Sequence, residues 1–395
     1  MQDAGLQQGY GFQTVGHIDA GAGAARRLGE LLARFAGEAQ GGAVLVVTDP
    51  GIRAGGLLEP ALQSLRQAGF APEVFDGVCA DPPDHVVLQA CELARRAGAR
   101  AVVGFGGGSS MDVAKIAACV AHPEQSLELA QLYGVESLRV RRLPLLQVPT
   151  TAGTGSEVTR VAIVTTGATT KSGIVNSALL ADAVVLDAEL TLGLPPAVTA
   201  ATGIDAMVHA IEAYTSAHRK NPMSDMLARE ALRLLGANLL RAVQQGDDLA
   251  AREHMLRGAM LAGMAFDNAP VAAVHALAYP LGGLHHLPHG LSNSLVLPHV
   301  LRFNLPAATE HYAELAEVLL PRAGGGSEAR AQALIEHLAD LGARSGLPTR
   351  LRECGIAESG LELLAREAMG QQRLLRNNPR PVTEADALAV YRAAY

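Results

Sequence analysis

Short apolar runs alternate with helical patterns through the first half of the chain. The runs 43–49, 100–108 and 183–187 are almost continuously apolar, which is typical of strands buried on both faces. Apolar residues recur at helical spacing in 85–98 and 109–121. This alternation predicts a parallel sheet covered by helices on both faces, and the segments 158–166 and 171–177 predict a hairpin attached to that domain.

The pattern changes after "LGLPP" at 192–196. The segments 197–216, 224–245 and 249–266 all show helical periodicity, and runs of β-branched residues disappear. A chain of 395 residues is also long for a single hydrophobic core. We therefore predict an α/β domain over 1–194 and an all-helical domain over 195–395, with the boundary at Pro195 and Pro196.

Composition narrows the class of protein. Hydrophobic residues make up 49% and charged residues 18%, which is typical of a compact globular protein, and the net charge of -7 gives no reason to expect nucleic acid as a partner. The four cysteines share no paired spacing and are expected to be reduced thiols. Neither a secretory signal nor an apolar run of membrane-span length is present, so we expect a cytoplasmic protein with no membrane partner.

A glycine-rich turn is the first candidate for chemistry. In "GFGGGSSMDVAK", Gly107 and Gly108 lie with two further glycines between a predicted strand and a predicted helix. Glycines there let the backbone approach an anion, and the helix start offers unpaired N–H groups, so the turn predicts a phosphate cradle. The alternative is that Ser109 only caps the helix and Asp112 completes a capping box. The sequence is neither a Walker A motif nor the usual GxGxxG.

Two further features fit a nucleotide site. Asp49 closes the first strand, where a carboxylate could accept both ribose hydroxyls of an adenosine, or where it could simply form the turn before Pro50. The loop "VPTTAGTGSEVT" at 148–159 carries two glycines and offers hydroxyl groups at Thr150, Thr151, Thr154 and Ser156. A plain loop needs fewer of both, so this segment predicts a second wall of the site.

Histidines and a carboxylate raise the question of a metal. Asp205 and His209 are four positions apart, so a helix places them on one face, and their flanks are mostly apolar. His275 and His289 would lie about 21 Å apart on a straight helix, so they can share an ion only if the chain turns between them.

Pro280, Gly282–Gly283 and Pro288 predict that turn. With it, the two imidazoles join Asp205 and His209 in a three-nitrogen, one-oxygen set suited to Zn²⁺ or Fe²⁺. The alternative is that these histidines are ordinary hydrogen-bonded core residues.

Five motifs in uninterrupted order give the chain a clear resemblance to the iron-containing (group III) alcohol dehydrogenase family, from about residue 10 to the C-terminus. They are "GGGSSMDVAK", "PTTAGTGSEVT", "GIDAMVHAIEAYTS", "HALAYPLGGLHHLPHGLSNSLVLPHVLRFN" and "NNPRPVTEADALAVYRAAY". The resemblance implies a nucleotide-binding α/β domain followed by an all-helical domain, as in dehydroquinate synthase-like proteins, with a site in the cleft between them. It also implies homodimers or larger assemblies.

The resemblance carries residue roles with it. It implies metal ligands at Asp205, His209, His275 and His289. It implies cofactor contacts at Asp49, Asp81, Gly107, Gly108, Ser109, Asp112, Thr150, Thr151, Thr154, Thr159 and Lys171. The cofactor is NAD(H) or NADP(H), and we expect NAD(H) because a carboxylate at Asp49 repels a 2′-phosphate; of the divalent metals we expect Fe²⁺ over Zn²⁺.

The expected activity is that of an NAD-dependent, metal-dependent alcohol dehydrogenase or aldehyde reductase acting on a small alcohol. Phe266 and Tyr279 are expected to line the substrate pocket, and His285 or His286 to carry the proton outward unless they are plain surface residues. The family often has a histidine where this chain has Tyr279, which puts the usual proton route in doubt.

The sequence leaves other functions open. A relative resembling maleylacetate reductase would be expected to have lost metal ligands, whereas one resembling glycerol dehydrogenase would use Zn²⁺. From another class, the chain could be a catalytically silent NAD- or metal-binding protein. Absorbance at 340 nm with NAD and small alcohols, with and without a chelator, separates these possibilities.

Overall fold

The computed structural model describes residues 9–37, 40–136, 138–167 and 170–395. These residues form two compact units, each with its own core. One unit is Thr14–Gly193, and the other is Leu194–Tyr395 together with the described residues that end at Gln13.

The first unit is built on a six-stranded sheet in which every pair of neighbouring strands is parallel. The strands, in spatial order, are β1 (His17–Ala20), β9 (Ala183–Leu186), β6 (Leu145–Pro149), β4 (Ala101–Gly106), β2 (Ala43–Val47) and β3 (Ala71–Phe75). The predicted parallel sheet is confirmed. The sequence analysis missed β1 and β3, because these edge strands are short, partly exposed and lack a continuous apolar run.

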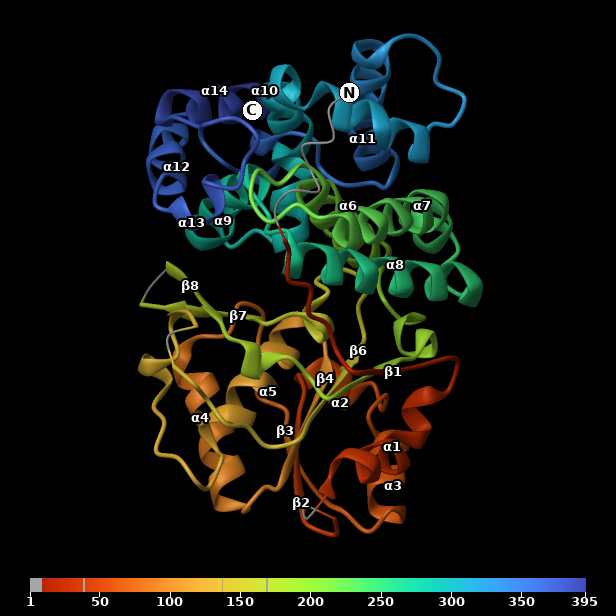
Figure 1. Ribbon diagram of the computed structural model, residues 1–395, viewed down its shortest axis with the longest axis vertical. Coiled ribbons are helices and arrows are strands. Elements are labelled where there is room, and N and C mark those ends of the chain that lie inside the picture. The colour runs from red at the N-terminus through yellow and green to blue at the C-terminus, as the bar shows by residue number, and fades with distance from the viewer. Residues whose placement is uncertain (1–8, 38–39, 137, 168–169) are drawn as a thin grey trace. The chain divides into compact units, whose positions relative to one another are not determined.

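Helices cover both faces of this sheet, as Figure 1 shows with α1 and α3 on one side and α4 and α5 on the other. They are α1 (Leu28–Phe35), α2 (Pro50–Ala54), α3 (Glu59–Gln67), α4 (Asp84–Arg96) and α5 (Gly108–Val120). Alternate residues of each strand point to opposite faces. Val44, Val46 and Phe105 therefore join the core with the leucines of α1 and α3. On the other face, the Gln147 side chain donates to the carbonyl of Met111 in α5.

A smaller sheet adjoins the same unit. β7 (Val161–Thr166) and β8 (Thr170–Val175) pair antiparallel, and the two-residue strand β5 (Gly134–Val135) pairs parallel with β8. The predicted hairpin is therefore confirmed. Asp112 of α5 accepts from the backbone N–H of Ile163, which fixes the hairpin against the helix that begins at the glycine turn.

The second unit is helical, and no strand occurs among the described residues after β9. Its main helices are α6 (Pro196–Thr215), α7 (Pro222–Gln244), α8 (Leu249–Asn268), α9 (Ala273–His285), α10 (His289–Leu319), α11 (Ser327–Arg344), α12 (Leu361–Ala368), α13 (Gln372–Leu375) and α14 (Glu384–Ala394). The predicted all-helical character is confirmed. No described helix is both long and apolar enough to cross a bilayer.

Candidate active site

Helix α6 supplies two of the predicted metal ligands. Asp205 and His209 are almost completely buried, at 2% and 4% exposure. They lie one turn apart on a helix whose residues from Gly203 to Thr215 are all buried. An ionised carboxylate in such surroundings is stable only when it has strong hydrogen-bonding or charged partners. The neighbours of Asp205 therefore show whether it can act as a metal ligand.

The chain turns between His275 and His289 as predicted, and of the suggested break points only Pro288, the N-cap of α10, lies at the turn. Helix α9 continues through Pro280 and Gly282 and ends at His285. The reversal occurs at His286, which adopts a left-handed conformation (φ 55°) and whose N–H bonds to the carbonyl of Gly282. The prediction that Pro280 and Gly282–Gly283 interrupt the helix was therefore wrong.

A tertiary contact attaches α9 to the C-terminal helix close to its internal proline. Pro280 removes one N–H from the hydrogen-bond ladder of the helix. The buried Tyr391 of α14 donates its phenol O–H to the neighbouring carbonyl of Leu277 at 2.6 Å, which attaches α9 to the C-terminal helix. The chain then passes through Pro288, and α10 begins at His289.

One glycine brings α10 close enough to α6. A Cβ added to Gly290 would lie 2.2 Å from the carbonyl oxygen of Ala201 and 3.3 Å from the Cβ of Asp205. No side chain larger than hydrogen fits there unless one of the helices moves. Since Gly290 directly follows His289, this close approach is what brings the last imidazole beside the carboxylate.

The four predicted ligands converge on one point. The Nε2 atoms of His289, His275 and His209 lie 3.6, 3.9 and 4.0 Å from Oδ1 of Asp205. One ligand atom from each residue lies within 4.8 Å of all the others. Ligands on a tetrahedron with bonds of about 2.1 Å are roughly 3.4 Å apart, so small side-chain movements suffice to bind one ion. The donor set therefore fits a divalent transition metal.

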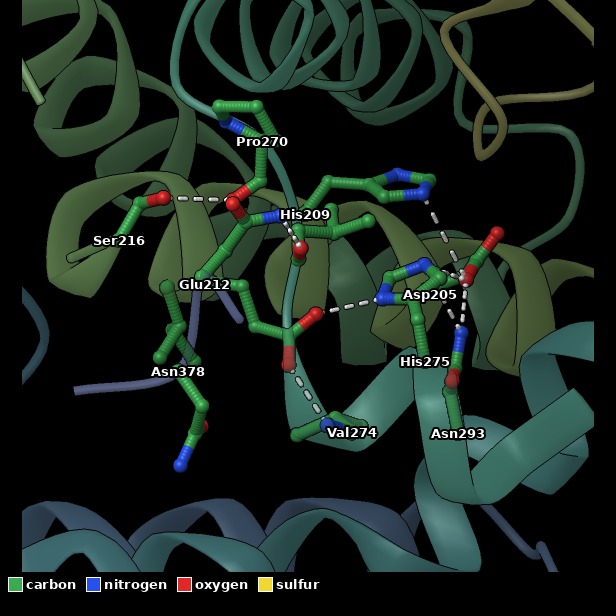
Figure 2. A network of polar contacts seen from close by, with 12 residues as sticks. Asp205, His209, Glu212, Ser216, Pro270, Val274, His275, Asn293 and Asn378 are labelled. Atoms are coloured by element: carbon green, nitrogen blue, oxygen red, sulfur yellow. Dashed lines mark hydrogen bonds and ion pairs between the residues drawn. The ribbon is translucent and has the colours of Figure 1, made fainter. Parts of the chain in front are cut away.

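Two polar residues that the sequence analysis missed complete this cluster (Figure 2). Glu212, one turn beyond His209 on α6, lies 2.6 Å from Nδ1 of His275. The amide of Asn293, one turn beyond His289 on α10, donates to Oδ1 of Asp205 at 2.6 Å. Glu212 follows His209 by three residues and Asn293 follows His289 by four, so helical spacing could have placed each beside a predicted ligand.

Electrostatics favour a charged carboxylate in this cluster. Burial acts to raise the pKa of Asp205, but the three imidazoles and the amide of Asn293 together bring that pKa below its ordinary value. The carboxylate is therefore ionised at neutral pH and available as a ligand.

Aromatic rings adjoin the ligand imidazoles. The ring of Phe266, on α8, stacks on that of His209 with 4.3 Å between centroids, and the ring of Tyr279 lies 5.9 Å from that of His289. Both side chains are half-buried, as a pocket lining requires. His285 and His286 are exposed at the end of α9.

The glycine turn in the other unit joins β4 to α5. Its N-cap is Gly107, and no side chain caps the helix. The alternative in which Ser109 caps the helix and Asp112 completes a capping box was therefore wrong. A Cβ on Gly108 would lie 2.8 Å from Cγ2 of Thr154, so a glycine is required where the loop after β6 crosses the helix start. The first N–H groups of α5 thus remain available for an anion.

The threonines of the second loop lie against this turn. The backbone N–H of Thr150 donates to the carbonyl of Gly106, and the Thr151 side chain lies 3.7 Å from where a Cβ of Gly107 would be. The Thr154 hydroxyl accepts from the N–H of Ser156. The two segments that the sequence suggested as walls of a nucleotide site are therefore adjacent.

Asp49 forms the turn before Pro50, which was one of the two roles that the sequence suggested for it. It caps α2 by accepting from the N–H groups of Gly51 and Ile52 through Oδ1. Its Oδ2 lies 3.4 Å from where a Cβ of Gly106 would be, so the second oxygen is near the glycine turn. The capping role and a ribose contact are compatible, because they use different oxygens.

Asp81 and Lys171 form an ion pair with 2.6 Å between Oδ1 and Nζ. Asp81 has a positive φ of 51° and stands just before α4, whereas Lys171 lies on β8. The carboxylate is 43% exposed and the lysine side chain 6% exposed. The pair therefore joins the hairpin to the loop before α4.

Asp112 and Thr159 belong to an internal network with a lysine that the sequence analysis missed. The fully buried Lys115 of α5 donates to Ser156, Thr159 and the carbonyl of Val161. Asp112 accepts from the Ser156 hydroxyl at 2.5 Å. This network holds α5 against the 3-10 helix that follows the threonine loop, at Ser156–Val158, so it supports the two walls from within.

Comparison with known proteins shows which family the chain resembles in sequence. A family model described as iron-containing alcohol dehydrogenase matches residues 16–188, and one described as Fe-containing alcohol dehydrogenase family, C-terminal, matches residues 199–395. Long-chain-alcohol dehydrogenase 1 of Geobacillus thermodenitrificans is 42% identical over 354 residues, 89% of each chain.

Solved structures agree. That of a 1,3-propanediol oxidoreductase matches with a TM-score of 0.93 at 37% identity, covering 98% of this chain and 100% of that chain. That of sulfoacetaldehyde reductase from Bifidobacterium kashiwanohense, in complex with NAD⁺, matches with a TM-score of 0.86 at 28% identity, covering 98% and 99%.

A parallel-sheet unit with a glycine turn, and a helical unit that gathers three imidazoles and a carboxylate, define a metal-assisted oxidoreductase. The chain belongs to the iron-containing alcohol dehydrogenase family. The family and the enzyme class predicted from the sequence motifs are confirmed.

Proposed function

We propose that this chain is a metal-dependent, NAD(H)-linked alcohol dehydrogenase or aldehyde reductase. It transfers hydride between a small alcohol and nicotinamide. The observation that carries the proposal is the convergence of three imidazole nitrogens on Oδ1 of Asp205, all within the range of one ion. The relatives, which are named as dehydrogenases and reductases, favour an enzyme over a catalytically silent metal-binding protein.

His209, His275 and His289 would hold the metal with Asp205. A divalent ion bound there supplies Lewis-acid polarisation of the substrate oxygen. We propose Fe²⁺ rather than Zn²⁺: the three-nitrogen, one-oxygen donors accept either ion, and the description of the family favours iron. A maleylacetate-reductase-like function, in which ligands would be lost, is disfavoured because all four are present and adjacent.

The aromatic rings supply the substrate pocket in this proposal. Phe266 shields the imidazole of His209, and Tyr279 stands beside His289, so both restrict where a substrate oxygen can approach the ion. His285 would exchange the proton with solvent, which its exposure at the end of α9 permits. The names of two solved relatives, a 1,3-propanediol oxidoreductase and a sulfoacetaldehyde reductase, support a small alcohol or aldehyde as the substrate class.

The first unit would bind NAD(H), which supplies the hydride acceptor or donor. Pyrophosphate would occupy the start of α5, at Gly107, Gly108 and Ser109, with the threonine loop (Thr150, Thr151 and Thr154) as the opposite wall. Asp49, Asp81 and Lys171 would bind the adenosine side of the cofactor. Asp112 and Thr159 would act indirectly, because they belong to the hydrogen-bond network around Lys115 that supports both walls. The NAD⁺ complex of the reductase relative supports this choice.

We propose NAD(H) over NADP(H) for an electrostatic reason. Oδ2 of Asp49 lies near the glycine turn, and a carboxylate there repels a 2′-phosphate. The ratio of kcat/KM for the two cofactors with one alcohol measures the preference. A ratio that favours NADPH would contradict this role of Asp49.

The proposal extends to the domains of the chain, its assembly and its cellular compartment. Residues 1–194 would form the dinucleotide-binding domain and 195–395 the metal and substrate domain, in a cytoplasmic homodimer or larger homo-oligomer. All four cysteines are free, and burial raises the pKa of Cys91 and Cys119 to about 12, which keeps these two thiols protonated and unreactive. Light scattering of the purified protein tests the assembly.

The central test combines metal content with turnover. Protein reconstituted anaerobically with Fe²⁺ should reduce NAD⁺ with small alcohols, and a chelator should abolish the absorbance change at 340 nm. His275→Ala removes one of four ligands, so we expect both the bound metal and turnover to be lost. His337→Ala, on α11, is the control and should retain both. Stoichiometric metal in His275→Ala would contradict the proposed ligand set.

A further inference from the structure

Glu212 makes two contacts with consecutive residues of α9. Its Oε2 lies 2.6 Å from Nδ1 of His275, and its Oε1 accepts from the backbone N–H of Val274 at 2.7 Å (Figure 2). The carboxylate is 3% exposed. Both of its oxygens are therefore used inside the protein, and both bind the first turn of the helix that carries a ligand imidazole.

This carboxylate replaces a missing helix cap. The N-cap residue of α9 is Ala272, which has no side chain that could accept a hydrogen bond. The first N–H groups of a helix have no partner within the helix, and its N-terminus favours negative charge. Glu212 supplies both an acceptor and a charge from α6, so it fixes the start of α9 relative to the helix that carries Asp205 and His209.

We propose that Glu212 is a positioning residue that sets the ring orientation and tautomer of His275. A carboxylate at Nδ1 accepts the ring N–H, which leaves Nε2 without a proton and directed at the cluster around Asp205. This inference rests on the proposed metal centre. Glu212 itself binds neither metal nor substrate; it acts through His275.

Charge balance gives Glu212 a second effect on the same site. Asp205 and Glu212 are both buried, and once the imidazoles are deprotonated, as metal ligands must be, the two carboxylates give the cluster a formal charge of minus two. A divalent ion neutralises that charge, whereas removing Glu212 leaves an ion bound by one carboxylate with excess positive charge in a buried setting. Both its geometry and its charge therefore favour a divalent ion in this cluster.

Two substitutions separate these effects. Glu212→Ala removes the hydrogen bonds and the charge, and outer partners of this kind typically contribute about 10- to 100-fold to metal affinity, so we expect a loss in that range. Glu212→Gln keeps the shape and one acceptor but lacks the charge, so we expect a smaller loss. Glu314→Gln is the matched control, because Glu314 accepts from the phenol of Tyr214 at 2.6 Å within the same helical unit.

The measurement is the Zn²⁺ dissociation constant, obtained by competition with a chromophoric chelator for folded apo-protein. The d–d spectrum of the Co²⁺-loaded protein provides a second readout. Glu212→Gln should change its band positions and intensities, because the orientation of His275 changes, while Glu314→Gln should not. Circular dichroism confirms that each variant is folded, and if Glu212→Ala does not fold, the comparison of Glu212→Gln with wild type decides.

The outcomes are distinct. A wild-type protein that binds no metal contradicts the proposed centre itself. A wild-type protein that binds Zn²⁺ while the folded Glu212 variants bind it equally tightly, with an unchanged Co²⁺ spectrum, overturns the role of Glu212 alone. Lower stability with unchanged affinity also overturns it, because that result assigns the residue to the fold only.

Discussion

Tyr279 takes the position in which related proteins often have a histidine, and its ring lies 5.9 Å from that of His289. An unperturbed phenol has a pKa near 10 and an imidazole one near 6.5, so tyrosine cannot simply replace histidine as a base at neutral pH. Its hydroxyl can still donate a hydrogen bond to a substrate oxygen. We therefore expect Tyr279 to orient the substrate, while water or another residue carries the proton.

Replacing Tyr279 with phenylalanine keeps the ring and deletes only the hydroxyl. Loss of one productive hydrogen bond costs roughly 0.5 to 1.5 kcal/mol, which lowers kcat/KM about two- to twelve-fold. Steady-state kinetics over a panel of alcohols measures the change, and metal content should stay at the wild-type level. Kinetics indistinguishable from wild type would mean that the tyrosine only packs beside the centre.

The cluster of candidate ligands could be predicted from the sequence, but the residues that support it could not. Asp205, His209, His275 and His289 stand out because charged and imidazole side chains are unusual in apolar helices. Glu212 and Asn293 have the same helical spacing from a ligand as many solvent-facing polar residues. Only the packing of α6, α9 and α10 shows that both are buried against the cluster.

At the scale of elements, buried strands could be predicted and edge strands could not. β2, β4 and β9 are buried and have almost continuously apolar sequences, whereas β1 and β3 pair on one side only and remain partly exposed. The break after α9 was predicted correctly at Pro288 but wrongly at Pro280 and Gly282–Gly283. Local rules place a helix end near Pro280, but α9 continues to His285 and is attached to α14 by the bond from Tyr391 to Leu277.

The packing of α10 on α6 gives a prediction at this scale. Gly290→Ala places a Cβ 2.2 Å from the carbonyl oxygen of Ala201, so the helices must separate. Overpacking of this kind costs about 1–3 kcal/mol of the free energy of unfolding, although alanine is intrinsically the better helix former. Since His289 moves with α10, we expect metal affinity to fall roughly tenfold, as when a ligand loses its support.

The control for this prediction is Gly360→Ala. Gly360 has a φ of −84°, and a Cβ added to it meets no atom within 4 Å. Denaturant unfolding and chelator competition should show this variant to be like wild type. If Gly290→Ala binds metal as tightly as Gly360→Ala does, the close approach of the two helices is not what positions His289.

At the scale of the whole molecule, one buried acid links stability to pH. Burial raises the pKa of Glu157 from its ordinary 4.5 to about 7, although its backbone hydrogen bond and the charge of Lys115 act to lower it. The folded pKa is therefore above the unfolded one. The contribution of this group to stability is fully present below about pH 4.5 and is lost as the pH rises through about 7.

Glu157→Gln removes that titration while keeping the shape of the side chain. The free energy of unfolding of wild type should therefore fall relative to that of the variant between pH 5 and pH 8, by at most about 3 kcal/mol at 1.36 kcal/mol per pKa unit. Urea unfolding of both proteins at the two pH values, followed by a probe in the α/β unit, measures the difference. A constant difference across this range would contradict the raised pKa.

The distribution of the cluster over three helices also sets an order of events. Asn293 and Asp205 are hydrogen-bonded across 88 positions of the chain, and His275 and Glu212 across 63. Contacts so distant in sequence form late in folding, after the cost of closing the loops between them has been met. A nascent chain therefore offers an ion only the local pair of Asp205 and His209, and the full centre exists only once α9 and α10 have docked on α6. We therefore expect the proposed centre to take up its metal only after folding.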